Sequence, residues 1–247
     1  MLTLRSTPNL SGVEICGDYE DLNALYDAIS IIVGDESYEG YYASETRLLG
    51  LCYEIRHAYQ GDRNTSMPND NSKYYSFYYF WPEMIFTAAV LGDFISLAES
   101  KICWLIRDDA MIIHENVKTE MINHLPNDIA YLRYFQNLIW NELKRTIGQK
   151  RFTKVFGVDE TRLRYNVFEQ SFIHYCTQMV DILNVKYIKW KPERRESYLA
   201  TVAEKLLKQN YDYDDLEDAV LEYAKEQGVP YYEIELEGMQ YPIEIKW

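Results

Sequence analysis

The sequence predicts an α+β fold that is mostly helical, with a small and mainly antiparallel sheet. Apolar residues recur at helical spacing in six or seven segments, whereas short alternating or aromatic segments lie near both ends and at residues 74–81. The 247 residues, 47% of them hydrophobic, suit one large domain or two small ones. We expect the sheet to combine the N-terminal strands, the 74–81 strand and a C-terminal hairpin.

Residues 74–99, YYSFYYFWPEMIFTAAVLGDFISLAE, are expected to form the centre of the fold. The aromatic run Tyr74–Trp81 favours a strand, and Pro82 is tolerated in the first turn of the helix that follows. Polar residues of this helix occupy only a narrow stripe, so other elements have to surround it. Its apolar run ends at Gly92 and Asp93, short of the ~20 residues that a membrane span needs.

The N-terminal part predicts two strands and two helices before this centre. Turn residues separate the strands, a capping aspartate begins the first helix, and a glycine ends each helix. The expected ranges are Leu2–Arg5 and Val13–Cys16 for the strands, Asp18–Gly34 and Thr46–Gln60 for the helices, and 35–44 and 62–73 for loops.

The second half predicts further helices and a hairpin. Residues 101–113 fit either a strand or a helix, and Pro126 is expected to end that region. Helices are expected over 128–147, 161–184, 193–209 and 214–227. Apolar and polar residues alternate on both sides of Gly238, which predicts a hairpin over Tyr232–Trp247. We expect a main domain, 1–190, and a helical pair plus hairpin, 191–247, packed together as one unit.

The composition restricts the partners and the compartment. The 39 acidic and 25 basic residues give a net charge of -14, so a nucleic acid is not an expected partner. Four widely spaced cysteines and an N-terminal segment without a long apolar run indicate the cytoplasm. The 23 tyrosines suit wet interfaces, which favours a protein partner or self-association. We expect no membrane contact and no cofactor.

A resemblance covers nearly the whole chain. The segments TPNLSGVEICGDYEDL, LLGLCYEIRHAYQGDR, YFWPEMIF and CTQMVDILNVKYI occur in this order. Together they resemble an uncharacterised bacterial family of domains of unknown function. The resemblance implies a bacterial cytoplasmic protein with no assigned activity, so it assigns a role to no residue.

Arg107 and His114 form one candidate catalytic pair. Six residues separate them, as in the Arg-x(4 to 6)-His motif of metal-independent RNases of the HEPN class, which act in toxin and phage-defence systems. Histidine supplies general acid-base catalysis near neutral pH, and arginine binds the phosphate. The pattern is common by chance, and the negative net charge opposes RNA binding.

A candidate ligand site lies at the end of the Thr46–Gln60 helix. Its binding-type side chains are Arg56, His57, Tyr59, Gln60 and Arg63. A helix C-terminus favours a protonated histidine, so this group is expected to suit an acidic ligand.

Two other patterns are explained by ordinary structure. His174, Thr177 and Asp181 share the polar side of a predicted helix, but a metal site would need further ligands, and none is expected. Glu235 or Glu237, followed by Glu244 and Lys246, resembles the strand pair of PD-(D/E)-x-K nucleases, although the acidic side of a solvent-facing hairpin accounts for these residues. The leading hypothesis is therefore a non-enzymatic binding or regulatory interaction protein, and the alternative is the HEPN-like RNase.

Overall fold

A four-stranded antiparallel sheet forms the base of the molecule. The computed structural model describes residues 1–34, 40–67, 72–107, 115–156, 176–207 and 211–247. The strand order is β1-β2-β4-β3, with β1 at Thr3–Ser6, β2 at Gly12–Gly17, β3 at Asn64–Ser66 and β4 at Tyr74–Phe80. Ile15 pairs with Phe77, and both side chains are buried. The central pair β2 and β4 therefore joins the sheet to the core.

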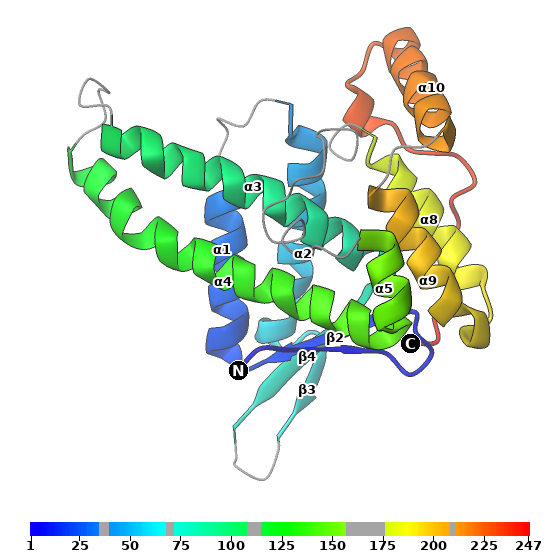
Figure 1. Ribbon diagram of the computed structural model, residues 1–247, viewed down its shortest axis with the longest axis horizontal. Helices are drawn as coiled ribbons and strands as arrows, with labels where there is room; N and C mark the ends of the chain where they lie inside the picture. The colour runs from blue at the N-terminus through cyan, green and yellow to red at the C-terminus, as the bar shows by residue number, and fades with distance from the viewer. Residues whose placement is uncertain (35–39, 68–71, 108–114, 157–175, 208–210) are drawn as a thin grey trace.

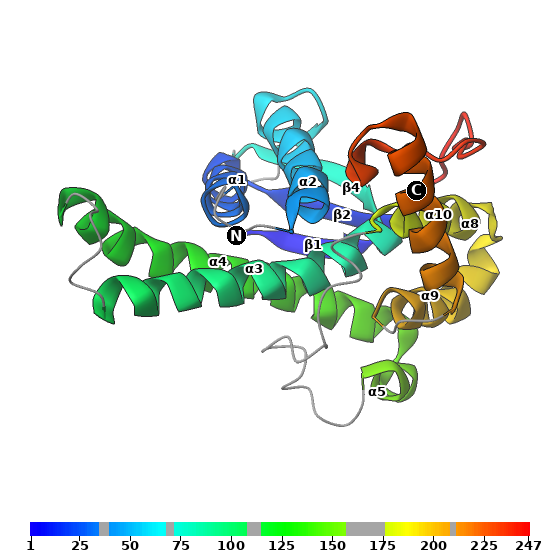
Figure 2. The same cartoon turned by 90° about the horizontal axis from the view of Figure 1, so that it is seen from above.

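The described helices account for most of the chain (Figure 1). They are α1 (Tyr19–Val33), α2 (Tyr42–Gln60), α3 (Trp81–Arg107), α4 (Glu115–Ile147), α5 (Gln149–Phe156), α8 (Gln178–Lys189), α9 (Pro192–Leu207), α10 (Tyr211–Gln227) and the short 3-10 helix η1 (Tyr231–Glu233). In Figure 2, α1 and α2 lie on one side of the strands, and the long pair α3 and α4 lies on the other. This arrangement confirms the predicted α+β class.

The helix after β4 is the core element, as the sequence predicts. Its side chains Trp81, Met84, Phe86 and Phe94 are fully buried. Helices α4, α8 and α9 all pack against it. Leu199 of α9 belongs to the same buried cluster as the residues of α3, so the C-terminal helices share the core of the sheet and of α1.

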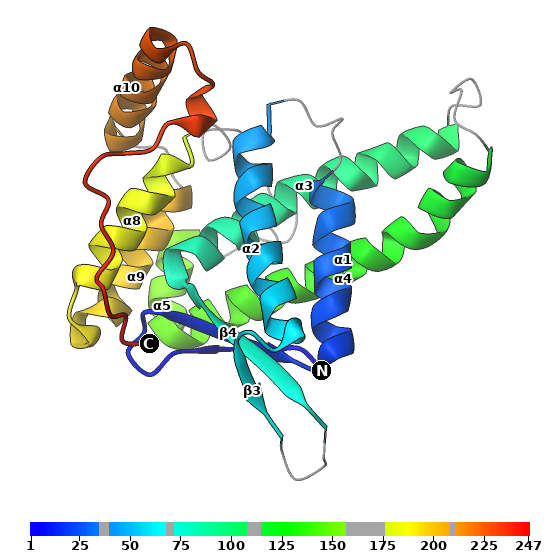
Figure 3. The ribbon, with the colours of Figure 1, turned by 180° about the vertical axis from the view of Figure 1, so that it is seen from behind.

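The predicted C-terminal hairpin is wrong. After η1, residues 234–247 contain no helix or strand and run along α8 toward the sheet (Figure 3). Side chains bind this backbone in place of a neighbouring strand: Asn9 Nδ2 donates to Trp247 O at 2.8 Å, and the hydroxyl of Ser11 donates to Lys246 O. The aromatic residues Tyr241 and Trp247 stack on rings of β4, with Tyr78 and Trp247 centred 5.2 Å apart, whereas Ile243 is fully exposed. The alternation of apolar and polar residues therefore does not indicate a strand here.

Residues 101–107 continue α3 as a helix, which is one of the two alternatives that the sequence leaves open. The expected end at Pro126 is wrong, because α4 continues through this exposed proline although it supplies no backbone N–H to the helix. The expected loop at 62–73 contains β3. Most of the helix predicted at 161–184 lies outside the described residues, and the described part begins at Gln178.

None of the described helices combines the length and the apolar character that crossing a membrane requires.

Candidate functional site

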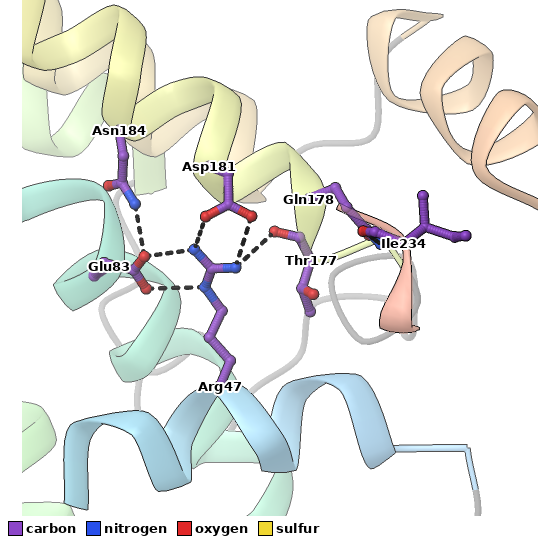
Figure 4. Close-up of polar contacts among 7 residues, drawn as sticks. All are labelled: Arg47, Glu83, Thr177, Gln178, Asp181, Asn184 and Ile234. Carbon is purple, nitrogen blue, oxygen red and sulfur yellow. Dashed lines mark hydrogen bonds and ion pairs between the residues drawn. The ribbon is translucent and has the colours of Figure 1, made fainter. Parts of the chain in front are cut away.

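Arg47 is the centre of a polar cluster between α2, α3 and α8 (Figure 4). Nε and Nη2 donate to the two oxygens of Glu83, with Nε at 3.0 Å from Oε2. Nη2 also donates to Asp181 Oδ1 at 2.7 Å, and Nη1 donates to Asp181 Oδ2 and to Thr177 O, each at 3.2 Å. A guanidinium has five N–H groups. All five donors of Arg47 are therefore used within the cluster.

Glu83 is the buried member of this cluster. It lies in the first turn of α3, where the helix dipole favours a negative charge. Its Oε1 also accepts a hydrogen bond from Asn184 Nδ2 at 2.6 Å. Burial lowers the pKa of Arg47, but the adjacent Glu83 and Asp181 outweigh it and raise that pKa. Arg47 thus stays protonated at every ordinary pH.

A cavity of about 390 Å³ opens beside this cluster. Arg47 and Thr46 of α2 form one part of its lining, and Thr177, Gln178 and Asp181 form another. The remaining wall comes from the C-terminal segment, namely Tyr232, Ile234, Glu235, Leu236, Met239 and Tyr241, and Ala43 of α2 completes the lining. Three distant parts of the chain thus build one site.

The C-terminal wall is fixed to α8 by Gln178. Its Nε2 donates to Tyr231 O at 2.9 Å and to Ile234 O at 3.0 Å. Gln178 is 4% exposed, and among the described residues its Oε1 has no donor. A buried acceptor without a donor costs free energy. The wall is thus held in place while one acceptor in the lining stays unsatisfied.

The charges of the site do not balance. Within the cluster, one guanidinium faces two carboxylates, and Glu235 adds a further carboxylate on the exposed part of the lining. Burial raises the pKa of the Tyr241 hydroxyl, and the nearby Asp181 and Glu83 raise it further, although Asn184 and Arg47 act in the opposite direction. The cavity therefore lies in a negative field.

The predicted ligand site at the end of α2 is divided among separate contacts. His57 Nδ1 lies 2.8 Å from Asp62 Oδ2, and Arg63 pairs with Glu54 at 2.8 Å. Tyr59 turns toward α1, where its ring contacts Tyr19 and Tyr26 edge to face. Arg56 lies over the ring of Tyr53, and Gln60 is exposed at the last position of the helix. His57 and Arg63 are therefore each paired with a nearby carboxylate, and the predicted residues do not form one common site.

A second cavity, also of about 390 Å³, includes one of these residues. Arg63 and Glu54 lie on one side of it, and the other lining residues are Tyr78, Tyr79, Phe80, Ile245 and Trp247. The ion pair of Arg63 occupies the arginine with a carboxylate of the same lining. The rings of Tyr78 and Phe80 stack on Trp247, so this cavity offers a mainly aromatic surface.

The predicted catalytic pair falls at a gap between the described residues. Arg107 is the last residue of α3, and only its backbone is described, while His114 lies outside the described residues. His174 also lies outside them, whereas Asp181 and Thr177 line the first cavity. Among the residues that the structure covers, no three His, Cys, Asp or Glu side chains are grouped so as to hold a metal ion.

Sequence reasoning missed Arg47 and Glu83. Arg47 falls among polar residues of an amphipathic helix, and Glu83 follows a proline at a helix start, where an acidic residue is ordinary. Arg47 and Glu83 are 36 residues apart in the sequence, and only the contact between α2 and α3 in the folded structure shows that the two charges meet. The one available signal in the sequence was Glu83, an acidic residue inside an otherwise apolar segment.

Comparisons with known proteins identify the family without assigning a function. No curated protein and no solved structure matches the chain. Residues 2–247 match the family described as Domain of unknown function (DUF6904). Because the match covers almost the entire chain, the protein belongs to this family.

Proposed function

We propose that this protein is a non-enzymatic binding protein, and that a side chain of a partner protein enters the cavity beside Arg47. The observation that carries the proposal is the complete use of Arg47 by Glu83, Asp181 and Thr177. A catalytic arginine needs donors directed at a substrate, whereas this one holds three helices and their cavity in place. The interactions of Arg47 therefore serve to hold the cavity in a fixed shape.

The rim of the cavity supports a protein as the partner. Tyr232 lines the cavity, and its ring centre lies 4.4 Å from that of Tyr42, which is exposed. Tyrosine is enriched in protein interfaces because its ring is apolar and its hydroxyl still bonds to water or to a partner. A pocket of this size accepts one large side chain. An anchored side chain surrounded by tyrosines is a common arrangement at interface centres.

Filling the cavity tests this proposal. Thr46 is an exposed lining residue of α2, so Thr46→Trp is expected to occupy the cavity without disturbing the core. Leu49→Trp is the matched control, since Leu49 is exposed on the same helix and does not line the cavity. We would titrate the full chain with four probes, n-butylammonium, butyrate, inorganic phosphate and n-butanol, and follow backbone amides by NMR.

The expected result is that at least one probe class shifts residues of the cavity lining in the wild type and in Leu49→Trp, and not in Thr46→Trp. If no probe shows this dependence on an open cavity, the cavity is not a binding site and the proposal fails. Native mass spectrometry of protein purified from its host then reports whether a partner or a second copy is retained.

The compartment and the alternative activity remain proposals. Four free cysteines support a reducing compartment, which agrees with the expected cytoplasm. The alternative hypothesis, a HEPN-like RNase, is tested at Arg107 and His114. If it is correct, substitution of either residue by alanine must abolish any RNase activity found. The net charge of -14 supports a partner other than nucleic acid.

A further inference from the structure

We propose that the cavity beside Arg47 recognises a positively charged side chain, the ammonium group of a lysine on the partner protein. This inference rests on the proposed binding function and names the chemistry that the site selects. It follows from three properties of the lining: the hydrogen-bonding groups left over, the net charge and the aromatic walls.

The charged and amide groups of the site have acceptors left over and few donors. Arg47 has no donor left, because its five N–H groups are bound inside the cluster. Asp181 receives one bond from Arg47 on each oxygen, and an ionised carboxylate accepts about four bonds in all. Gln178 adds a buried amide oxygen without a donor among the described residues. A ligand that brings several donors fits this lining, and an ammonium brings three.

The net charge selects the same ligand. An anion would approach two lining carboxylates, Asp181 and Glu235, and would find the single arginine already neutralised. The side chain of Asp181 is 36% exposed, so it remains accessible from the cavity. Partial exposure keeps the field moderate, because water and salt screen it. A cation is nevertheless favoured over an anion at both lining carboxylates.

The walls complete the fit. Tyr232 and Tyr241 line the cavity together with Leu236 and Met239. Aromatic rings attract a cation and also cover the methylene groups that precede it. A lysine side chain has both parts, a four-carbon stem and a terminal charge. The cavity thus offers apolar walls for the stem and carboxylates for the charge.

Matched peptides separate charge from shape. The probes are acetyl-Gly-Lys-Gly-amide, its norleucine analogue, which has no charge, and its glutamate analogue. Dissociation constants would be measured by NMR titration of the full chain at low salt. We expect the lysine peptide to bind about tenfold or more tightly than the norleucine peptide, as for one charge-assisted hydrogen bond. Binding is expected to weaken as salt is added.

Two variants locate the charge. Glu235→Gln is expected to weaken lysine-peptide binding about twofold to fivefold, the usual effect of an exposed ion pair. Glu237→Gln is the control, since Glu237 is exposed on the same segment and does not line the cavity. Asp181→Asn is expected to weaken binding by about tenfold, and its folding is checked by circular dichroism because Asp181 also contacts Arg47. A correctly folded Glu235→Gln protein keeps the test valid if Asp181→Asn unfolds.

The outcomes distinguish this inference from the binding function itself. If the glutamate or norleucine peptide binds in the open cavity as tightly as the lysine peptide, the inference is overturned while the binding function stands. If Thr46→Trp changes the binding of no peptide and no probe, both the inference and the proposed binding function fail. A free diamine, 1,5-diaminopentane, tests the source of the charge: binding of the diamine without binding of the lysine peptide overturns the assignment to a partner protein.

Discussion

Arg47 shows how one side chain combines stability with the shape of a site. It is partly buried, with 17% of its side chain exposed, and it faces two carboxylates on different helices. Burying charges costs free energy, which the cluster offsets only because each donor of the guanidinium is matched. Removing the arginine would leave Glu83, which is 8% exposed, beside Asp181 without a counter-charge. The free energy of unfolding should thus depend on the ion pair between Arg47 and Glu83.

We therefore expect Arg47→Met to lower the free energy of unfolding by about 2–3 kcal/mol, below the ~3–5 kcal/mol of a fully buried pair because the cluster reaches solvent. The double variant Arg47→Met with Glu83→Gln should lose less than the sum of the two single variants. Urea unfolding measures all three. Arg63→Met, which breaks an exposed pair with Glu54, should cost less than about 1 kcal/mol. Simple additivity would show that the two side chains act independently.

Among the elements, the pairing of β2 with β4 leaves no room at Gly12. A Cβ atom at this position would lie 2.0 Å from the carbonyl oxygen of Tyr79 in the neighbouring strand. A backbone atom cannot rotate away, so any side chain here would force the strands apart. The close approach of β2 and β4 therefore requires glycine at position 12. Strand β2 also contains Ile15, which is buried in the core.

Gly12→Ala is expected to destabilise the protein by about 2 kcal/mol or more, the range of a backbone clash in a packed region. Gly50→Ala is the control, because Gly50 lies exposed in α2 and a Cβ there meets nothing within 4 Å. This control should gain about 0.5–1 kcal/mol from the better helix propensity of alanine. Equal effects of both substitutions in thermal unfolding would contradict the close approach.

The sequence predicts elements whose signals are local. Asp18 caps α1 as expected, and Asp21 in the first turn completes a capping box, since both partners lie within four residues. The predicted C-terminal hairpin is wrong because this segment is held by the rings of β4, which are distant in sequence, and alternation alone cannot reveal such contacts. Arg47 and Glu83 escape prediction for the same reason. Contacts between α2, α3 and α8 create the site, and no periodicity within one helix encodes them.

Across the whole molecule, the long helix α4 is tied to the sheet through Glu142. Its Oε1 accepts a hydrogen bond from the Ser6 backbone N–H at 2.5 Å, and Arg145 donates to both of its oxygens. Burial raises the pKa of Glu142, but the bonds from Arg145 and Ser6 outweigh it, so the pKa lies below its ordinary 4.5. A lowered pKa means that the folded state favours the charged form. The contribution is present above pH 4.5 and is lost as the pH falls through the lower folded-state value.

We expect Glu142→Gln to cost about 1–3 kcal/mol at pH 7, as for a hydrogen bond to a charged group. The difference from the wild type should shrink as the pH falls below 4.5. Glu222→Gln, at an exposed position of α10, is the control and should have little effect at either pH. Chemical denaturation at pH 7 and near pH 4 measures both, and a difference that grows on acidification would contradict the lowered pKa.

The cavity draws on residues 43–47, 177–181 and 232–241, and this wide spacing has a consequence during protein synthesis. A ribosome completes the Arg47 helix long before the codons for Tyr232 and Tyr241 are read. A nascent chain therefore lacks one wall of the cavity until this last portion emerges and folds onto α8. Prematurely terminated or C-terminally clipped chains retain most of the core yet lose the lining residues of this segment, so the proposed binding would require translation to reach its end.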